Sequence, residues 1–343
     1  MDKLPTDTDE WNSLNEGKQK EILTNLYLET GDSDGVARAL KGCLPREQIR
    51  ELMRNAGLNR NWLNRQRQPL YVPKILYLDI ETAPVTGAVW GLWNNNLGLK
   101  QIYTDWYMIC WAGMWEHERE VFGDSLHLTK RKKRKGLKWY KDDLAIVQSL
   151  WDKLEEADVV IGHNSKKFDI AKWQSRSIEL GLLPPTPFRQ IDTLEASKKH
   201  KFTSNKLDWL VSRFVGRNKL NTDMDLWNRC YDGDTSKYQE YDGLDAFEYM
   251  YKYNGVDIEL LREVYLYLRP WMNSHPNLAV IVGDTTPRCP ACTSDQLDDG
   301  GLYPTNASLF PAHRCRACGH ISRGRFSLLS REQRRSLLIS TAG

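Results

Sequence analysis

The sequence contains no long apolar run and no large excess of charge of either sign. Its 343 residues include 48 Lys or Arg and 45 Asp or Glu, so the formal net charge is only +3. No apolar stretch approaches the roughly 20 residues that a membrane-spanning helix needs. Residues 1–10 are polar and acidic, unlike a secretory signal. We therefore expect a cytoplasmic protein that does not contact membranes.

The seven Cys residues do not form the even, regular pattern of a disulfide framework. Four of them make two Cys-x-x-Cys pairs near the C-terminus. A Cys-x-x-Cys turn brings two thiolates to one ion, and two such turns complete a closed tetrahedral site of the structural zinc type. We predict a zinc ribbon over residues 285–325 that holds one Zn²⁺. The candidate ligands are Cys289, Cys292, Cys315 and Cys318, with His313 and His320 as alternatives.

Positive charge is concentrated in two places. Eight Lys or Arg and no acid lie between Lys130 and Lys141, and seven Arg against one Glu lie from Arg314 to the end, which includes a basic tail at residues 326–343. Such patches fit phosphate contacts, but a solvated loop and a frayed tail have the same composition. The zinc ribbon with its Arg-rich flank fits a nucleic-acid clamp or a protein–protein contact. The candidate phosphate contacts in the first run are Arg131, Lys132, Lys133 and Arg134.

Residues 1–68 have the pattern of short helices. Residues 18–30, 36–40 and 45–55 show helical spacing, and a Gly-containing turn joins the last two, as in a helix-turn-helix. A DNA-binding motif and a small helical bundle with another role, such as binding a protein partner, both fit this pattern. The steps of four residues place three candidate phosphate contacts on one helical face. They are Arg46, Arg50 and Arg54.

From Pro73 onward the pattern changes to buried strands that alternate with helices. We expect strands at 74–79, 106–115, 119–123, 158–162 and 189–194. Helices are predicted at 142–156, 169–180, 206–215 and 244–268. Three strands followed by helix–strand–helix alternation predict a mixed-sheet α/β domain over residues 73–270.

Three positions of this domain carry acidic residues that stand out. Asp79 and Glu81 end the first strand, where residues two apart point to the same face. Paired carboxylates repel each other unless a cation or a proton lies between them, and divalent cations prefer oxygen ligands. Asp169 opens a helix, and Tyr253 and Asp257 lie one turn apart on another. Taken singly, solvated acids, a helix cap and an ordinary half-buried Tyr explain these residues equally well.

Together the motifs resemble those of the DnaQ-like exonucleases of the RNase H-like superfamily. Asp79-x-Glu81 resembles motif I, Asn164-x-x-x-Phe168-Asp169 motif II and Tyr253-x-x-x-Asp257 motif III. The resemblance covers about residues 73–270 and implies an RNase H-like five-stranded mixed sheet. The Tyr is that of the DEDDy branch, because Lys252 stands where the sister branch has His. His163 and His200 do not fit that sister pattern.

The resemblance implies a 3′→5′ exonuclease that uses two Mg²⁺ or Mn²⁺ ions. Asp79, Glu81 and Asp257 would hold one ion, Asp79 would bridge to the second, and Asp169 would hold that second ion through water. Tyr253 would position the attacking water. The expected partner is nucleic acid, DNA with a 3′ end more than RNA. A non-catalytic nucleic-acid-binding or regulatory protein on the same scaffold and an exoribonuclease are the alternatives.

A Trp-rich insert departs from the family pattern at residues 84–105. Trp90, Trp93 and the adjacent Trp106 are candidates for stacking on bases. Packing within the domain is the competing interpretation of these residues.

Overall fold

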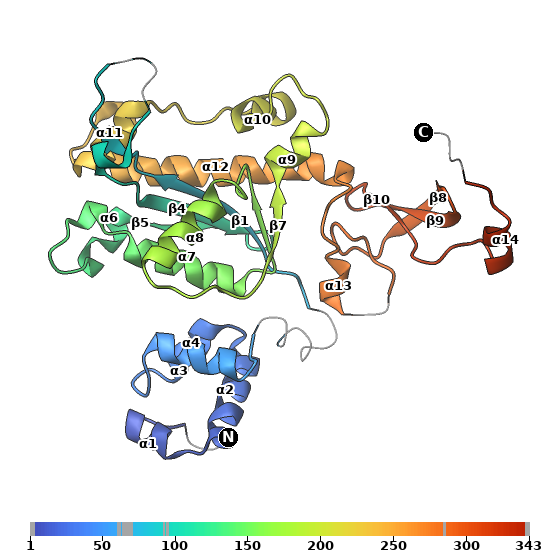
Figure 1. The fold of residues 1–343 in the computed structure, drawn as a ribbon, viewed down its shortest axis with the longest axis horizontal. Helices are drawn as coiled ribbons and strands as arrows, with labels where there is room; N and C mark the ends of the chain where they lie inside the picture. The colour runs from blue at the N-terminus through green and yellow to red at the C-terminus, as the bar shows by residue number, and fades with distance from the viewer. Residues whose placement is uncertain are drawn as a thin grey trace. The chain divides into compact units, whose positions relative to one another are not determined.

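The computed structural model describes residues 4–59, 63, 71–91, 93, 96–283 and 286–339. Contacts divide the protein into two compact units. The first joins Met1–Leu63 to Lys74–Tyr265, and the second joins Asn64–Pro73 to Leu266–Gly343. Figure 1 shows the helices and strands of each unit. No helix in the described ranges combines the length and the apolar character that crossing a bilayer requires.

A five-stranded mixed sheet forms the centre of the first unit. In spatial order its strands are β5 (Val121–Ser125), β4 (Met108–Trp115), β1 (Ile75–Thr82), β6 (Val159–Gly162) and β7 (Arg189–Asp192). Strand β4 runs antiparallel to β1 and β5, whereas β1, β6 and β7 are parallel. Strands β4 and β6 are buried along their whole length, which explains why they are continuous apolar runs in the sequence. The predicted α/β class and mixed five-stranded sheet are confirmed.

Helices cover the two faces of this sheet (Figure 1). Helices α7 (Leu144–Glu156) and α8 (Asp169–Glu179) lie on one face, and the 23-residue helix α12 (Ala246–Leu268) runs along the other. The ring of Tyr77 in β1 lies 5.8 Å from that of Tyr265 in α12. Because side chains alternate along a strand, Asp79 and Glu81 also point toward α12. The alternation therefore directs both carboxylates to the helix that carries Tyr253 and Asp257.

Several short elements lie outside the predicted ones. They are β2 (Thr86–Gly87), β3 (Ile102–Thr104), α6 (Leu126–Thr129), α9 (Thr193–Lys198) and α11 (Met224–Asp232), with 3₁₀ turns η1 (Leu99–Gln101), η2 (Lys130–Lys132), η3 (Trp139–Lys141), η4 (Gln239–Tyr241) and η5 (Arg269–Trp271). Most are too short for a periodic pattern to appear. Helix α11 has clear end signals, because Asp223 caps its first turn and Gly233 ends it with φ of 75°. The predicted helix near 206–215 is α10 (Leu207–Val215).

The N-terminal helices have a core of their own within the first unit. They are α1 (Thr8–Ser13), α2 (Glu16–Thr30), α3 (Ser33–Ala39) and α4 (Arg46–Asn55). Trp11, Leu23 and Leu40 are among the largest buried side chains of this cluster. Pro45 occupies the position just before α4, without a side-chain capping hydrogen bond. Helices α3 and α4 thus follow each other through a short turn, as predicted.

Two of the three arginines of α4 do not have the predicted environment. The guanidinium of Arg50 is 7% exposed, forms an ion pair with Asp152 of α7 and lies 4.1 Å from the ring centre of Trp151. Arg46 pairs with Asp34 and, at 2.5 Å, with Asp152. This placement argues against the predicted phosphate contacts of Arg46 and Arg50, because acids within the protein already engage both groups. Arg54 is exposed, and its phosphate contact stays a prediction.

The second unit contains a small antiparallel sheet. Its strands are β8 (Leu297–Thr305), β9 (Ser308–Cys315) and β10 (Ile321–Arg323), in the order β10-β9-β8. The short helices α13 (Ala279–Val282) and α14 (Arg331–Arg335) precede and follow it. The buried cluster around its cysteines contains only Cys289, Ala291 and Cys315. Leu268, Met272, Leu278 and Val282 are also buried in this unit, so the cysteine cluster is one part of a small apolar interior.

Candidate active site

Three carboxylates meet at the end of strand β1. One oxygen each of Asp79, Glu81 and Asp257 lies within 4.8 Å of the other two. The first two come from β1, and Asp257 comes from the middle of α12. Strand alternation and the packing of α12 on the sheet bring them together. The structure thus unites three of the five residues that the sequence singles out for catalysis.

The electrostatics of this cluster favour a cation. Burial and the negative charges of Asp169, Glu81 and Asp257 raise the pKa of Asp79 well above its usual value. Burial and the charge of Asp257 raise the pKa of Glu81 to about 8. The Oδ1 atom of Asp257 is buried without a hydrogen-bond partner among the described residues. Carboxylates that repel one another and retain an unpartnered oxygen match the ligand set of a hard divalent cation.

Asp169 lies beside this cluster and contacts the backbone of β1. It is the first residue of α8, it is 2% exposed, and its Oδ1 accepts the N–H of Ile80 at 3.0 Å. Burial raises the pKa of Asp169 to about 7. The N-cap position belongs to Phe168 instead. Asp169 is therefore not a plain helix cap, because its carboxylate accepts a hydrogen bond from the strand that carries Asp79.

Tyr253 and Asn254 face the cluster from α12. Burial and the charge of Asp257 raise the pKa of Tyr253 to about 12, so the phenol keeps its proton at neutral pH. The ring of Tyr253 meets that of Trp227 edge-on at 6.1 Å. Asn254 is fully buried, and its Nδ2 donates to Oδ2 of Asp79 at 2.5 Å. Asn254 was not predicted, although its position beside Tyr253 in the motif was a usable signal.

Lys219 is the second residue that sequence reasoning missed. Its Nζ lies 2.5 Å from Oδ2 of Asp257 and 5.0 Å from the ring centre of Tyr253. Burial alone would lower the pKa of Lys219, but the negative charge of Asp257 outweighs this and raises it. A lysine in a loop between two helices carries no local pattern that reveals such a role. Only the fold brings this cation to the acids.

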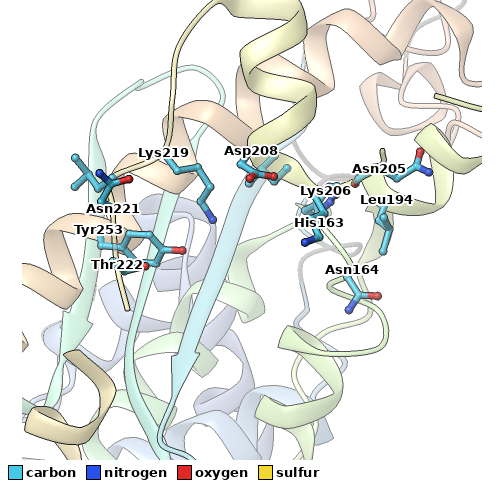
Figure 2. A pocket seen from close by; sticks show the side chains of 12 residues that line it. His163, Asn164, Leu194, Asn205, Lys206, Asp208, Lys219, Asn221, Thr222 and Tyr253 are labelled. Atoms are coloured by element: carbon cyan, nitrogen blue, oxygen red, sulfur yellow. Dashed lines mark hydrogen bonds between the residues drawn. The ribbon is translucent and has the colours of Figure 1, made fainter. Parts of the chain in front are cut away.

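A cavity of about 750 Å³ opens beside the cluster, with Tyr253 and Lys219 in its wall. Figure 2 shows the Lys219 amine and the Tyr253 hydroxyl directed to the middle of this space, with Asn164 and His163 across from them. Asn164, the predicted nucleic-acid contact of motif II, thus lines the cavity. The remaining wall consists of Leu194, Asn205, Lys206, Leu207, Asp208, Leu220, Asn221 and Thr222.

The loop that carries Asn164 is held by the buried carboxylate of Asp192. Asn164 has the left-handed φ of 69°, and its N–H donates to Asp192 at 2.9 Å. The ring nitrogens of His163 contact Oγ1 of Thr193 and the carbonyl oxygen of Asn205, each at 2.9 Å. Burial lowers the pKa of His163. His163 is therefore a neutral structural residue that links its loop to α9 and to Asn205, and it is not a free base.

The predicted phosphate contacts of the basic segment have mixed environments. Arg131, Lys132 and Lys133 are exposed. Arg134 instead pairs with the buried Asp142 at 2.8 Å through Nη2. The first three cations are thus accessible to a partner, whereas Arg134 already neutralises an acid.

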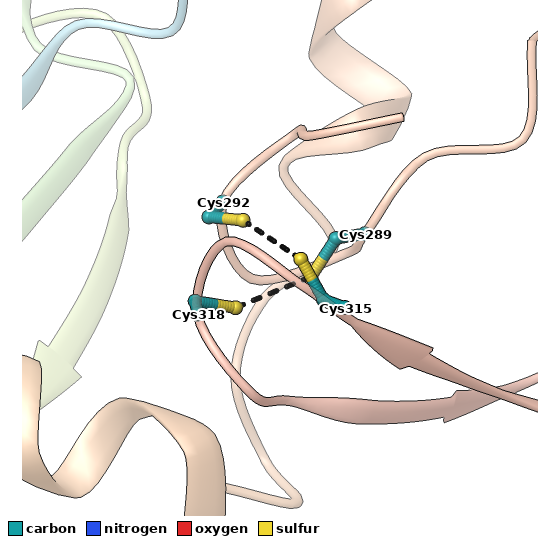
Figure 3. A group of neighbouring side chains, drawn as sticks. All are labelled: Cys289, Cys292, Cys315 and Cys318. Carbon is teal, nitrogen blue, oxygen red and sulfur yellow. Dashed lines mark hydrogen bonds between the residues drawn. The ribbon is translucent and has the colours of Figure 1, made fainter. Parts of the chain in front are cut away.

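Four cysteine sulfurs form the second cluster, in the second unit (Figure 3). The Sγ atoms of Cys289 and Cys318 lie 3.6 Å apart, as do those of Cys292 and Cys315, and all four lie within 4.8 Å of one another. A disulfide requires about 2.05 Å, whereas sulfurs about 2.3 Å from a shared ion have this wider spacing. The structure therefore supports a site that could bind a zinc ion.

Comparisons with known proteins do not identify the chain. No model of a known protein family matches it, and a search of curated proteins finds no match. The functional interpretation therefore depends on the geometry of the two clusters.

Proposed function

We propose that the first unit is a metal-dependent 3′→5′ exonuclease with an RNase H-like fold, of the DEDDy type, acting on DNA more than on RNA. The observation that supports this most is the meeting of Asp79, Glu81 and Asp257, with Lys219 beside Asp257 in the wall of a cavity that Asn164 also lines. Asp169 lies near Asp79, and Tyr253 lies near Asp257. A polar cavity beside clustered acids is the environment that phosphodiester hydrolysis needs.

The residues present fit two divalent ions. Asp79, Glu81 and Asp257 would hold one Mg²⁺ or Mn²⁺, and Asp79 with Asp169 would hold the second. When bound, the ions would neutralise charge that develops on the phosphate and make water a nucleophile near neutral pH. The unpartnered Oδ1 of Asp257 and the mutual repulsion of the acids are the features of this chain that fit such ligands.

The chain's own groups would orient the reactants. Tyr253 keeps its proton, so its hydroxyl can hold a water by a hydrogen bond but is a poor base. Asn254 fixes the rotamer of Asp79. Lys219 points into the cavity and can contact a phosphate oxygen once a cation takes its place at Asp257.

One observation favours the alternative of a non-catalytic nucleic-acid-binding protein. The Lys219 ammonium lies against Asp257, where it competes with a divalent cation. If that ion pair persists with substrate, the scaffold would bind nucleic acid without cutting it.

In the second unit we propose one structural zinc ion, held by Cys289, Cys292, Cys315 and Cys318. The left-handed residues Thr293 and Gly319 follow the second Cys of each pair, which gives the two turns the same shape. Four ligands leave no open position, so this ion would stabilise the fold and take no part in chemistry.

The test is digestion of 5′-labelled single- and double-stranded DNA and RNA with Mg²⁺ or Mn²⁺. We expect a ladder of products shortened from the 3′ end that Asp79→Ala and Asp257→Asn abolish while binding survives. These variants are a more specific control than EDTA, because EDTA would also remove zinc from the cysteine site. Full activity in either variant would refute the assignment, and binding without any cleavage by the natural chain would establish the non-catalytic alternative.

A further inference from the structure

The insert that follows β1 exposes large aromatic side chains. Trp90 is 100% exposed, Trp93 85% and Tyr103 75%. Rings so exposed add nothing to the core, which rules out the packing interpretation for Trp90 and Trp93. Trp106 differs, because the Lys172 amine lies 3.8 Å from its ring centre and covers one face. The exposed aromatic set is therefore Trp90, Trp93 and Tyr103, on and beside the β2–β3 ribbon.

Helix α11 connects this ribbon to the acidic cluster. The Tyr231 hydroxyl lies 2.8 Å from Oγ1 of Thr104 in β3 and 3.0 Å from Oγ1 of Thr86 in β2. One turn earlier, Trp227 meets the ring of Tyr253 at 6.1 Å. Residues four apart share a helical face, so one face of α11 touches both the site and the ribbon. The ribbon that carries the exposed rings is thus held to the same helix that contacts Tyr253.

The basic segment 130–141 joins the same helix. The Lys141 amine lies 4.1 Å from the ring centre of Tyr231. The seven cations from Lys130 to Lys138 are exposed, and Arg134 is the one that forms an ion pair with a described acid. The others leave an uncompensated positive surface. Exposed rings and uncompensated cations on segments attached to one helix are a combination that binds single-stranded nucleic acid, because rings stack on bases and cations contact phosphates.

We infer that the β2–β3 ribbon and the segment 130–141, joined by α11, form a track for single-stranded nucleic acid that leads to the acidic cluster. The inference deepens the proposed function and rests on it for the position of the 3′ end. A duplex hides its base faces, so the rings select a strand that is already unpaired. Binding by stacking and phosphate contacts also predicts little preference for base sequence.

The first experiment measures how the effect of the aromatic rings depends on strand length. The triple variant Trp90→Ala/Trp93→Ala/Tyr103→Ala is compared with the natural chain on a dinucleotide and on a single-stranded 20-mer. Each stacked base contributes a factor of about 5–100, so the ratio of kcat/KM between 20-mer and dinucleotide should fall at least about tenfold. Trp271→Ala, an exposed Trp of the second unit, is the matched control and should leave the ratio unchanged. An unchanged ratio in the triple variant would overturn the track.

The second experiment tests the track without turnover. Asp79→Ala protein binds a labelled 20-mer, with and without Lys130→Gln/Arg131→Gln/Lys135→Gln, over a salt series. Loss of three phosphate contacts should reduce the slope of log K against log salt by about 2. The control removes three exposed cations of the N-terminal helices, Lys20, Arg38 and Lys41, by the same change.

The outcomes separate the two ideas. Normal track binding with no hydrolysis in any form would refute the exonuclease and keep the track. Two results would refute the track and keep the exonuclease. One is hydrolysis together with an equal slope of log K against log salt in both cation variants. The other is hydrolysis together with tighter binding of blunt duplex than of single strand.

Discussion

Single residues determine which chemistry the acidic cluster can support. Lys219 reaches it from a loop and Tyr253 from α12, and both carry a proton at neutral pH. A protonated phenol and an ammonium act by donating hydrogen bonds. The carboxylates are the groups in this cluster that can hold cations. The acids would therefore bind ions, whereas Tyr253 and Lys219 would donate hydrogen bonds.

The role of Tyr253 predicts a graded effect on activity. Tyr253→Phe removes the hydroxyl and keeps the ring that packs on Trp227. We expect kcat to fall by roughly 10²-fold, in the range of a lost positioning contact, while the affinity for Mn²⁺ is unchanged. Single-turnover hydrolysis and calorimetric Mn²⁺ titration measure the two quantities. A loss as complete as that of Asp79→Ala would show that Tyr253 does more than position water.

The raised pKa values of the carboxylates predict how stability changes with pH. The pKa is about 8 for Glu81 and about 7 for Asp169, against ordinary values near 4 in an unfolded chain. The folded state without metal therefore binds more protons than the unfolded state. The stability that these groups contribute is complete below about pH 4 and is lost as the pH rises to about 8.

Removing one negative charge from the acidic cluster should reduce the loss of stability at high pH. Asp79→Asn keeps the shape of the side chain, so it should raise the Tm of the metal-free protein by roughly 2–4 °C at pH 8 and by less at pH 5. Thermal unfolding at the two pH values measures the difference, with Asp208→Asn at the cavity wall as the control for loss of a charge. A larger gain at pH 5 would contradict the sign.

At the scale of elements, α4 is attached to α7 by charge. Arg50 and Asp152 are 7% and 8% exposed, and the guanidinium also lies over Trp151. Arg46 also pairs with Asp152, so removing Arg50 leaves this buried acid with one ion pair instead of two. The three arginines of α4 therefore divide into two that anchor the helix and one that faces solvent.

This division predicts different costs for similar changes. Arg50→Ala should lower the free energy of unfolding by about 3 kcal/mol, the usual cost of breaking a buried pair. Arg54→Ala, one turn later and exposed, should stay within about 0.5 kcal/mol. Urea unfolding of both variants measures the values. Equal costs would show that the Arg50 contact with α7 does not hold in solution.

At the scale of the whole molecule, the two units differ in what stabilises them. The first buries a large apolar core around the sheet, whereas the second buries a smaller apolar set, which includes Leu268, Met272 and Leu278, beside its cysteine cluster. A structural ion adds stability to a small core only where it is bound. The units should therefore respond differently to loss of metal.

Removal of zinc tests this difference. Cys315→Ser should abolish the order of β8–β10, seen as rapid proteolysis after residue 270, while the first unit keeps its thermal transition. His313→Ala is the matched control, because the four cysteines suffice as ligands. A cysteine variant that still resists proteolysis would contradict a structural ion at this site.

The sequence by itself determined the class of the fold and the acids of the site. Alternation along β1 and the four-residue step in α12 are local periodicities, so Asp79 with Glu81 and Tyr253 with Asp257 could be placed on shared faces from the residues alone. The two Cys-x-x-Cys turns are equally local, and their sulfurs lie together in the structure.

Only the tertiary structure decided which neighbours these residues have. Lys219, Asn254 and the α11 residues Trp227 and Tyr231 reach the site or its surroundings through packing between distant segments. For Arg50 the periodicity identified a face correctly but not what covers it, and the covering helix proved to be α7. The physical reason is the same in each case: periodicity fixes the direction of a side chain relative to its own element, whereas long-range packing fixes what it meets.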